Sequence, residues 1–124
     1  YQDQVTCLGN RRYFDMQFNQ LLSEKLVLGS LLLIELQGLK QYNESKGYKA
    51  GDQLIKQLAE TIQDNFLDIK LNFIARTGGS TFAILTPNTS EEEVSQLATG
   101  LIHAIEESLH SKKIADMMIH IGIV

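Results

Sequence analysis

One acidic side chain, Glu35, interrupts the most apolar stretch of the chain, Leu31–Leu36, which reads Leu-Leu-Leu-Ile-Glu-Leu. A carboxylate inside such a segment is costly to bury unless it is paired, protonated or placed at the edge of a cleft. Two interpretations therefore remain open. Glu35 either lies at a strand end that reaches water, or it is a metal or substrate ligand at the edge of a sheet.

A second stretch of interest is Thr77-Gly78-Gly79-Ser80, which lies between two short apolar runs within Phe73–Leu85. Paired glycines between runs rich in β-formers predict a hairpin, because glycine adopts the positive φ of primed turns without a Cβ penalty. Spacing alone favours a plain structural hairpin.

The other candidate side chains have structural explanations. Asp52 is expected in the first turn of a helix, where a negative charge suits the helix dipole. His103 and His110 are seven residues apart in one expected helix, which is too far along the axis for both to chelate one ion. His120 alternates with isoleucines, as a strand residue does. Cys7 is the only cysteine, so no intrachain disulfide can form.

Caps and periodicity indicate the elements that must position these residues. Asn10 can cap the first helix, and Ser90 with Glu93 has the form of a capping box before a long helix to about residue 110. The expected elements are a helix over Arg11–Lys25, a strand over Leu31–Leu36 in the middle of the sheet and covered on both faces, a helix over Gly38–Lys46 stopped by Gly47, a helix over Ala50–Phe66, strands over Asn72–Arg76 and Ser80–Thr86, the long helix, and a last strand over Met117–Val124.

This order of helices and strands predicts an α/β (α+β) sandwich of the ferredoxin-like kind, with a central sheet flanked by helices. No linker divides the chain, so residues 1–124 are expected to form a single domain. The net charge of -4 and the scattered Lys and Arg residues argue against nucleic acid as the main partner. No apolar run approaches the roughly 18 residues of a membrane span. The chain lacks an initiator methionine and ends inside an apolar run, so both ends look cut from something longer.

Four stretches, in order along nearly the whole chain, resemble the GGDEF domain, the diguanylate cyclase module of bacterial cyclic-di-GMP signalling. Gly9–Phe14 resembles its N-terminal Asn-Arg-Arg motif, and Leu33–Lys40 resembles its first strand, which usually ends Asp-x-Asp-x-Phe-Lys. Asn43–Asp52 resembles its helix–turn–helix, and Ala75–Phe82 its signature hairpin. The resemblance implies a nucleotide-cyclase-like sheet whose C-terminal part would lie beyond Val124.

The resemblance also implies a definite chemistry. Active members bind GTP across the hairpin and the first strand, and two such domains meet face to face. Each 3′-hydroxyl then attacks the α-phosphate of the other nucleotide. Two metal ions, held by an acid of the first strand and by the third signature residue, neutralise the phosphate charge. The fourth signature residue, also an acid, is expected to help activate the attacking hydroxyl.

This chain departs from that pattern at the reactive positions. The third and fourth signature residues are Ser80 and Thr81, so both acids are replaced by neutral hydroxyls. Mg²⁺ is usually held by carboxylates and phosphates, and Thr81 is far too weak a base near neutral pH. Glu35 matches the metal-binding acid of the first strand. The window Ile69–Asn72 lacks the Arg-x-x-Asp sequence of the family's inhibitory product site.

Other positions match the nucleotide-binding residues of the family. Asn43 and Asp52 correspond to its guanine-contacting residues, and Lys40 is retained. Together with the turn at Gly78 and Gly79, they could cradle a guanine nucleotide, with Mg²⁺ as an optional companion of GTP.

The expected function is therefore a catalytically inactive GGDEF domain that serves as a regulatory or interaction module and requires no cofactor. The expected partner is an adjacent EAL domain or another signalling domain of the same protein, with a homodimer as the other assembly. One alternative is an allosteric guanine-nucleotide-binding domain that controls an EAL phosphodiesterase. Another is a weak cyclase with Glu35 as its only acid. The domain is expected to be cytoplasmic, within a parent protein anchored in the inner membrane.

Overall fold

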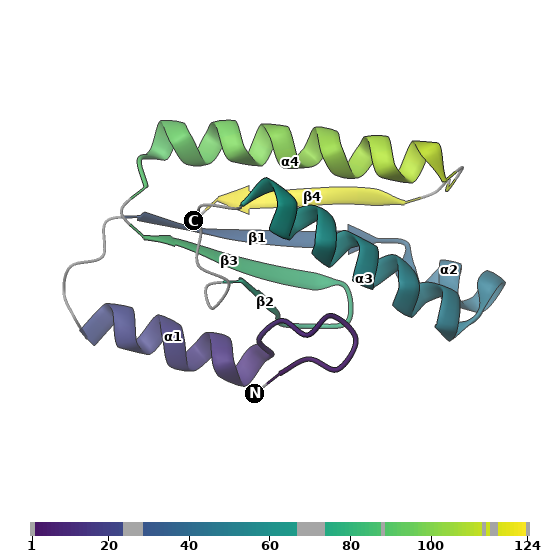
Figure 1. The fold of residues 1–124 in the computed structure, drawn as a ribbon, viewed down its shortest axis with the longest axis horizontal. Coiled ribbons are helices and arrows are strands. Elements are labelled where there is room, and N and C mark those ends of the chain that lie inside the picture. The colour runs from purple at the N-terminus through teal and green to yellow at the C-terminus, as the bar shows by residue number, and fades with distance from the viewer. Residues whose placement is uncertain are drawn as a thin grey trace.

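The computed structural model describes residues 2–23, 29–66, 74–87, 89–112, 114 and 117–123. Its helices and strands follow the expected order (Figure 1). They are α1 (Arg11–Ser23), β1 (Gly29–Gln37), α2 (Leu39–Lys46), α3 (Tyr48–Asn65), β2 (Ile74–Arg76), β3 (Thr81–Pro87), α4 (Glu91–Ser111) and β4 (Met118–Ile123). The end of the first expected helix, the start of the strand expected from Asn72 and the window Ile69–Asn72 lie outside the described residues.

The described strands form one antiparallel sheet in the order β2-β3-β1-β4. β1 is thus an interior strand, as its apolar sequence predicted. Leu33 lies opposite Ala83 of β3 and opposite Gly122 of β4, which fixes the register on both sides of β1. The arrangement confirms the predicted sheet flanked by helices.

The helices are divided between the two faces of the sheet (Figure 1). α3 and α4 pack on one face, and the main core lies between them and the sheet. Leu32, Ile34, Phe82 and Ile84 point into this core and are fully buried. α1 packs on the opposite face, where it covers a smaller cluster centred on Phe14, Ala75, Ala83 and Leu85.

The prediction that β1 is covered on both faces was wrong. The burial of its side chains alternates along the strand, and Leu33 is 40% exposed. The reason is the position of α1, whose cluster draws on β2, β3 and the start of β1. The half of that face formed by β4 and the later part of β1 faces solvent. Glu35 belongs to this uncovered half, on the same face as Leu33.

The two predicted caps are confirmed. The Oδ1 of Asn10 accepts a hydrogen bond from the Tyr13 amide at 3.0 Å, and the Oγ of Ser90 accepts one from the Glu93 amide at 3.1 Å. These side chains satisfy backbone donors that have no partner inside the helix. Among the described helices, none is long and apolar enough to cross a membrane.

The start of α3 differs from the expectation. α3 begins at Tyr48, two residues before the expected Ala50, so Asp52 lies in the second turn and the first turn carries no acid. The dipole explanation for Asp52 is therefore weaker than its sequence position suggested, because that effect fades beyond the first turn. Gly47 does end α2, but with φ 93° and ψ 157° instead of the left-handed helical conformation.

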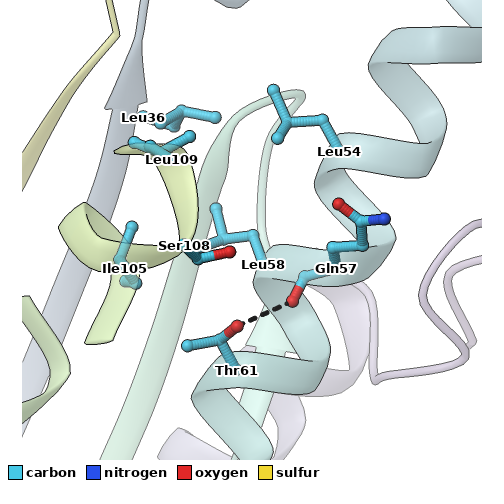
Figure 2. Close-up of a pocket in the computed structure, with 8 residues that line it drawn as sticks. All are labelled: Leu36, Leu54, Gln57, Leu58, Thr61, Ile105, Ser108 and Leu109. Carbon is cyan, nitrogen blue, oxygen red and sulfur yellow. Dashed lines mark hydrogen bonds between the residues drawn. The ribbon is translucent and has the colours of Figure 1, made fainter. Parts of the chain in front are cut away.

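α3 and α4 close over β1, and side chains of all three elements line a small cavity between them (Figure 2). Leu54, Leu58, Ile105 and Leu109 meet Leu36 there, and the remaining cavity is about 10 Å³. A cavity of that size is at the lower limit for a single water molecule.

Candidate functional site

The C-terminal end of β1 and the hairpin between β2 and β3 lie side by side. The Leu36 amide donates a hydrogen bond to the Ser80 carbonyl oxygen at 2.9 Å, and Glu35 is the register partner of Thr81. Because Leu36 and Ser80 share that hydrogen bond, Glu35 and Thr81 form the adjacent non-hydrogen-bonded pair, whose side chains lie closer together. The structure thus brings Glu35, Ser80 and Thr81 together at one end of the sheet.

The turn itself does not use glycine as predicted. The Thr77 amide donates to the Thr81 carbonyl oxygen at 2.9 Å, yet neither Gly78 nor Gly79 has a positive φ. A Cβ added to Gly79 would meet nothing within 4 Å, and one added to Gly78 would make only ordinary contact, at 3.5 Å, with Thr81. Neither backbone strain nor packing requires these glycines. Because neither glycine has a side chain, another molecule can approach the backbone of the turn closely.

We expect Gly79→Ala to change the free energy of unfolding by no more than about 0.5 kcal/mol, because the new methyl group points into open space. Urea denaturation followed by circular dichroism measures this change. The matched control is Gly29→Ala at the start of β1, where an added Cβ would overlap the Thr86 carbonyl oxygen. Such overpacking against backbone typically costs about 1–3 kcal/mol. A loss above 1 kcal/mol for Gly79→Ala would show that the turn does need glycine.

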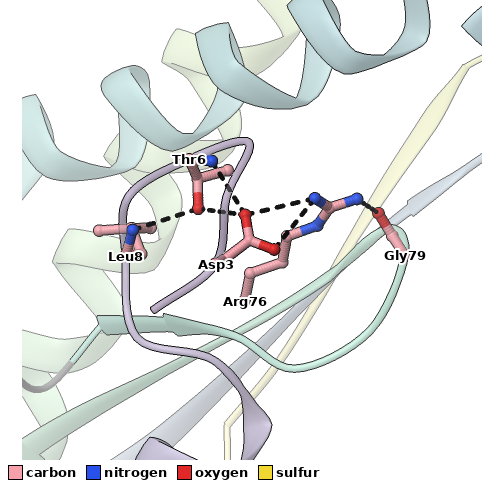
Figure 3. Close-up of polar contacts among 5 residues, drawn as sticks. All are labelled: Asp3, Thr6, Leu8, Arg76 and Gly79. Carbon is pink, nitrogen blue, oxygen red and sulfur yellow. Dashed lines mark hydrogen bonds and ion pairs between the residues drawn. The ribbon is translucent and has the colours of Figure 1, made fainter. Parts of the chain in front are cut away.

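An ion-pair network ties the N-terminal segment to the hairpin (Figure 3). The Nη1 of Arg76 contacts both carboxylate oxygens of Asp3 at 3.3 Å, and its Nη2 donates to the Gly79 carbonyl oxygen at 2.7 Å. The Arg76 amide also donates to the Gly9 carbonyl oxygen at 2.8 Å. Arg76 therefore holds both the residues that precede α1 and the tip of the turn.

The Asp3 carboxylate is well satisfied. It accepts hydrogen bonds from the Thr6 amide at 2.9 Å and from the Thr6 hydroxyl at 2.7 Å. Burial acts to raise the pKa of Asp3, but the hydrogen bonds from Thr6 and the charge of Arg76 outweigh burial and leave that pKa below its usual value of 3.8. Sequence reasoning missed this network. Asp3 and Arg76 are 73 residues apart, and no local pattern connects them.

The expected nucleotide-binding residues of α2 and α3 lie beyond the same end of β1, because α2 follows β1 directly through Gly38. Lys40 and Asp52 are exposed, and Asn43 is half-buried. Asn43 lies against Gly51 so closely that a Cβ on Gly51 would overlap its Oδ1. That Oδ1 is buried and has no hydrogen-bond partner within the described part of the chain.

Two helix glycines, Gly51 near the start of α3 and Gly100 in the middle of α4, should respond oppositely to alanine. Gly100→Ala on α4, where an added Cβ meets nothing, is expected to raise the free energy of unfolding by roughly 0.5–1 kcal/mol through helix propensity. Gly51→Ala has the same propensity gain, but Asn43 must move, so we expect a net loss of about 1 kcal/mol. Urea titrations of both variants measure the difference. Equal stabilisation by both would show that Asn43 yields without cost.

The donor set at the end of β1 limits the chemistry of the site. It contains one carboxylate, Glu35, with its register partner Thr81 on the same face of the sheet, whereas Ser80 pairs with Leu36, whose side chain points to the other face. No group of three or more His, Cys, Asp or Glu side chains among the described residues is placed to hold a metal ion. Two Mg²⁺ ions held by two carboxylates, as the family resemblance implies, do not fit these residues. The register adds one group that sequence reasoning left without a role, because His120 of β4 lies directly opposite Glu35.

The sequence of the chain is similar to that of one known protein family. Residues 1–124 match the model of the family described as diguanylate cyclase, GGDEF domain. The chain is 30% identical over 127 aligned residues to an uncharacterised membrane protein of Staphylococcus haemolyticus, and the match covers 98% of the chain and 35% of that relative.

Solved structures agree with the family match. The S helix–GGDEF–EAL structure of Vibrio cholerae LapD bound to c-di-GMP is 29% identical, with a TM-score of 0.82 over 99% of the chain and 28% of the chain in that structure. The GGDEF domain of TpbB (YfiN) from Pseudomonas aeruginosa is 26% identical, with a TM-score of 0.80 over 99% of the chain and 74% of that structure. The chain spans about a third of the length of the curated relatives that it matches.

Proposed function

The chain belongs to the GGDEF domain family, and we propose that it is a non-catalytic regulatory or interaction module within cyclic-di-GMP signalling. The observation that carries the proposal is the replacement of both signature acids by Ser80 and Thr81, next to a single remaining carboxylate on Glu35. The hairpin of β2 and β3 is present, while the two carboxylates of the family signature are absent from it.

The chemistry of phosphoryl transfer explains why these two replacements matter. Catalysis rests on metal ions that neutralise developing phosphate charge and on a group that activates the attacking hydroxyl. The Ser80 hydroxyl is neutral and adds no charge to hold Mg²⁺. The Thr81 hydroxyl does not take up a proton near neutral pH. Glu35 alone supplies neither a second metal ligand nor a separate base.

The retained contacts support a regulatory role. Arg76 joins the residues that precede α1 to the tip of the hairpin through Asp3 and the Gly79 carbonyl oxygen. A displacement of the segment around Asp3 would therefore shift Arg76 and, through it, the turn at Gly79. This connection depends on Arg76 and Asp3 and does not involve Ser80 or Thr81.

The relatives support a composite parent protein. LapD of Vibrio cholerae carries a GGDEF domain next to an EAL domain, and the staphylococcal relative is named a membrane protein. We propose that an EAL domain or another signalling domain of the same protein is the partner of this module. We also propose that the parent protein is anchored in a membrane, with the module on the cytoplasmic side; the name of the staphylococcal relative supports the anchor.

The test is incubation of the chain with GTP and either Mg²⁺ or Mn²⁺, followed by chromatography of the nucleotides. We expect GTP to be recovered without cyclic-di-GMP. Formation of cyclic-di-GMP would overturn the non-catalytic role.

A second function, allosteric binding of a guanine nucleotide, is favoured by the bare turn at Gly78 and Gly79 and by the retained Asn43 and Asp52. Calorimetric titration with GTP separates this function from a purely structural module. Binding that Asn43→Ala weakens at least tenfold would support it. No heat up to millimolar GTP, with the variant indistinguishable from the original chain, would exclude it and leave the interaction module.

A further inference from the structure

The uncovered half of the sheet places an imidazole beside the single carboxylate of the site. His120 on β4 is the register partner of Glu35 on β1, and partners in an antiparallel ladder point to the same face. Both side chains are exposed, because α1 packs over β2 and β3 instead of this half of the sheet (Figure 1). Thr81 of β3 is the partner of Glu35 on its other side. The three side chains form one row across β3, β1 and β4.

We propose that Glu35 and His120 bind a divalent transition-metal ion of the zinc class. Directly paired residues have Cβ atoms about 5 Å apart, and nitrogen and oxygen ligands lie about 2 Å from Zn²⁺. A glutamate and a histidine that start at this separation can converge on one ion. An imidazole nitrogen suits Zn²⁺ and its neighbours in the first transition row, whereas Mg²⁺ prefers oxygen ligands throughout. The pair would therefore select a different metal from a site built of two carboxylates.

The surroundings of the pair leave it available to an ion. Within the described part of the chain, neither the Glu35 carboxylate nor the His120 imidazole forms a hydrogen bond or an ion pair. The residues that flank them on the same face are uncharged, namely Leu33, Gln37, Met118 and Gly122. Two protein ligands leave the remaining coordination positions open to water or to a phosphate oxygen.

The metal site is independent of the non-catalytic role of the domain. The non-catalytic role depends on Ser80 and Thr81, whereas the metal site depends on Glu35 and His120. A chain that binds no Zn²⁺ could still lack cyclase activity. A chain that makes cyclic-di-GMP could still bind Zn²⁺ through His120.

The test is calorimetric titration of the chain with ZnCl₂, together with visible absorption spectra after addition of CoCl₂. We expect one Zn²⁺ per chain and a Co²⁺ spectrum that reports nitrogen ligation. His120→Ala and Glu35→Gln should each weaken Zn²⁺ binding at least tenfold. Because both residues are exposed, thermal unfolding of these variants without metal should match that of the original chain.

A matched control uses the composition of the chain, which has three histidines. The double variant His103→Ala/His110→Ala leaves His120 as the only imidazole, and it also removes the histidines of α4, each of which has Glu106 and Glu107 within one helical turn. The double variant should retain full Zn²⁺ affinity. No Zn²⁺ binding by the original chain, or binding that survives His120→Ala and is lost in the double variant, would overturn the proposal.

Discussion

Arg76→Ala is expected to lower the free energy of unfolding by about 2 kcal/mol, between the cost of losing an exposed ion pair and that of breaking a fully buried one. The Arg76 and Asp3 side chains are 14% and 19% exposed, so solvent replaces the lost contacts only in part. The variant also loses the hydrogen bond to the Gly79 carbonyl oxygen. Urea denaturation of the variant and the original chain measures the loss.

The chain contains a matched control for this variant. Arg11 forms an ion pair with Asp15 one helical turn away at 3.3 Å, but these side chains are 69% and 55% exposed. We expect Arg11→Ala to cost no more than about 0.5 kcal/mol, as exposed pairs on helices do. Equal losses in Arg11→Ala and Arg76→Ala would show that the network around Asp3 contributes no more than a surface pair.

The same network predicts a dependence on pH. The pKa of Asp3 lies below its usual value in the folded chain, so folding favours the ionised carboxylate. This contribution is fully present above the unfolded pKa of about 3.8 and is lost as the pH falls through the lower, folded pKa. The stability advantage of the original chain over Asp3→Asn should therefore be larger at pH 7 than at pH 3. An advantage that stays constant over this range would contradict the assignment.

Phe82→Ala is expected to have the largest effect of any single side-chain truncation in the hairpin. Phe82 is fully buried in the main core, between the sheet and the α3 and α4 layer. Truncating a buried phenylalanine costs about 3–5 kcal/mol, because transfer free energy is lost and a cavity remains. Thermal and urea unfolding measure the loss, and Phe82→Leu gives a milder variant if the alanine variant does not fold.

A second phenylalanine provides the comparison. Phe18 on α1 is half-buried and packs edge-to-face on Phe14, with ring centroids 5.9 Å apart, over the smaller cluster. Because Phe18 buries less apolar surface, we expect Phe18→Ala to cost only about 1–2 kcal/mol. A smaller loss for Phe82→Ala than for Phe18→Ala would contradict the view that the hairpin is anchored in the main core.

Local signals in the sequence predicted the elements well. Caps at Asn10 and Ser90 act through bonds that span only three residues, so the residue types are enough to find them. The middle position of β1 also followed from its apolar sequence. Its coverage did not, because leucines at alternate positions look the same whether a helix covers them or not. The position of α1 decides that Leu33 is exposed.

Long-range pairs could not be predicted in the same way. The contact of Asp3 with Arg76 and the pairing of Glu35 with His120 both depend on which strands become neighbours and in which register. A shift of one residue would turn His120 to the opposite face of the sheet. The pair of glycines in the hairpin was also misleading. Gly78 and Gly79 suggested a turn with positive φ, while the glycines with positive φ among the described residues are Gly38 and Gly47.

We propose that the hairpin between β2 and β3 retains the frame of a diguanylate cyclase hairpin without its catalytic chemistry. The most direct test is a mass-spectrometric measurement of cyclic-di-GMP after incubation with millimolar GTP and Mg²⁺ or Mn²⁺, with an active cyclase in the same buffer as the positive control. We expect no more product from this chain than from buffer alone. Product that increases with chain concentration and disappears in Glu35→Gln would contradict the claim, because it would show that one carboxylate beside Ser80 and Thr81 is enough for catalysis.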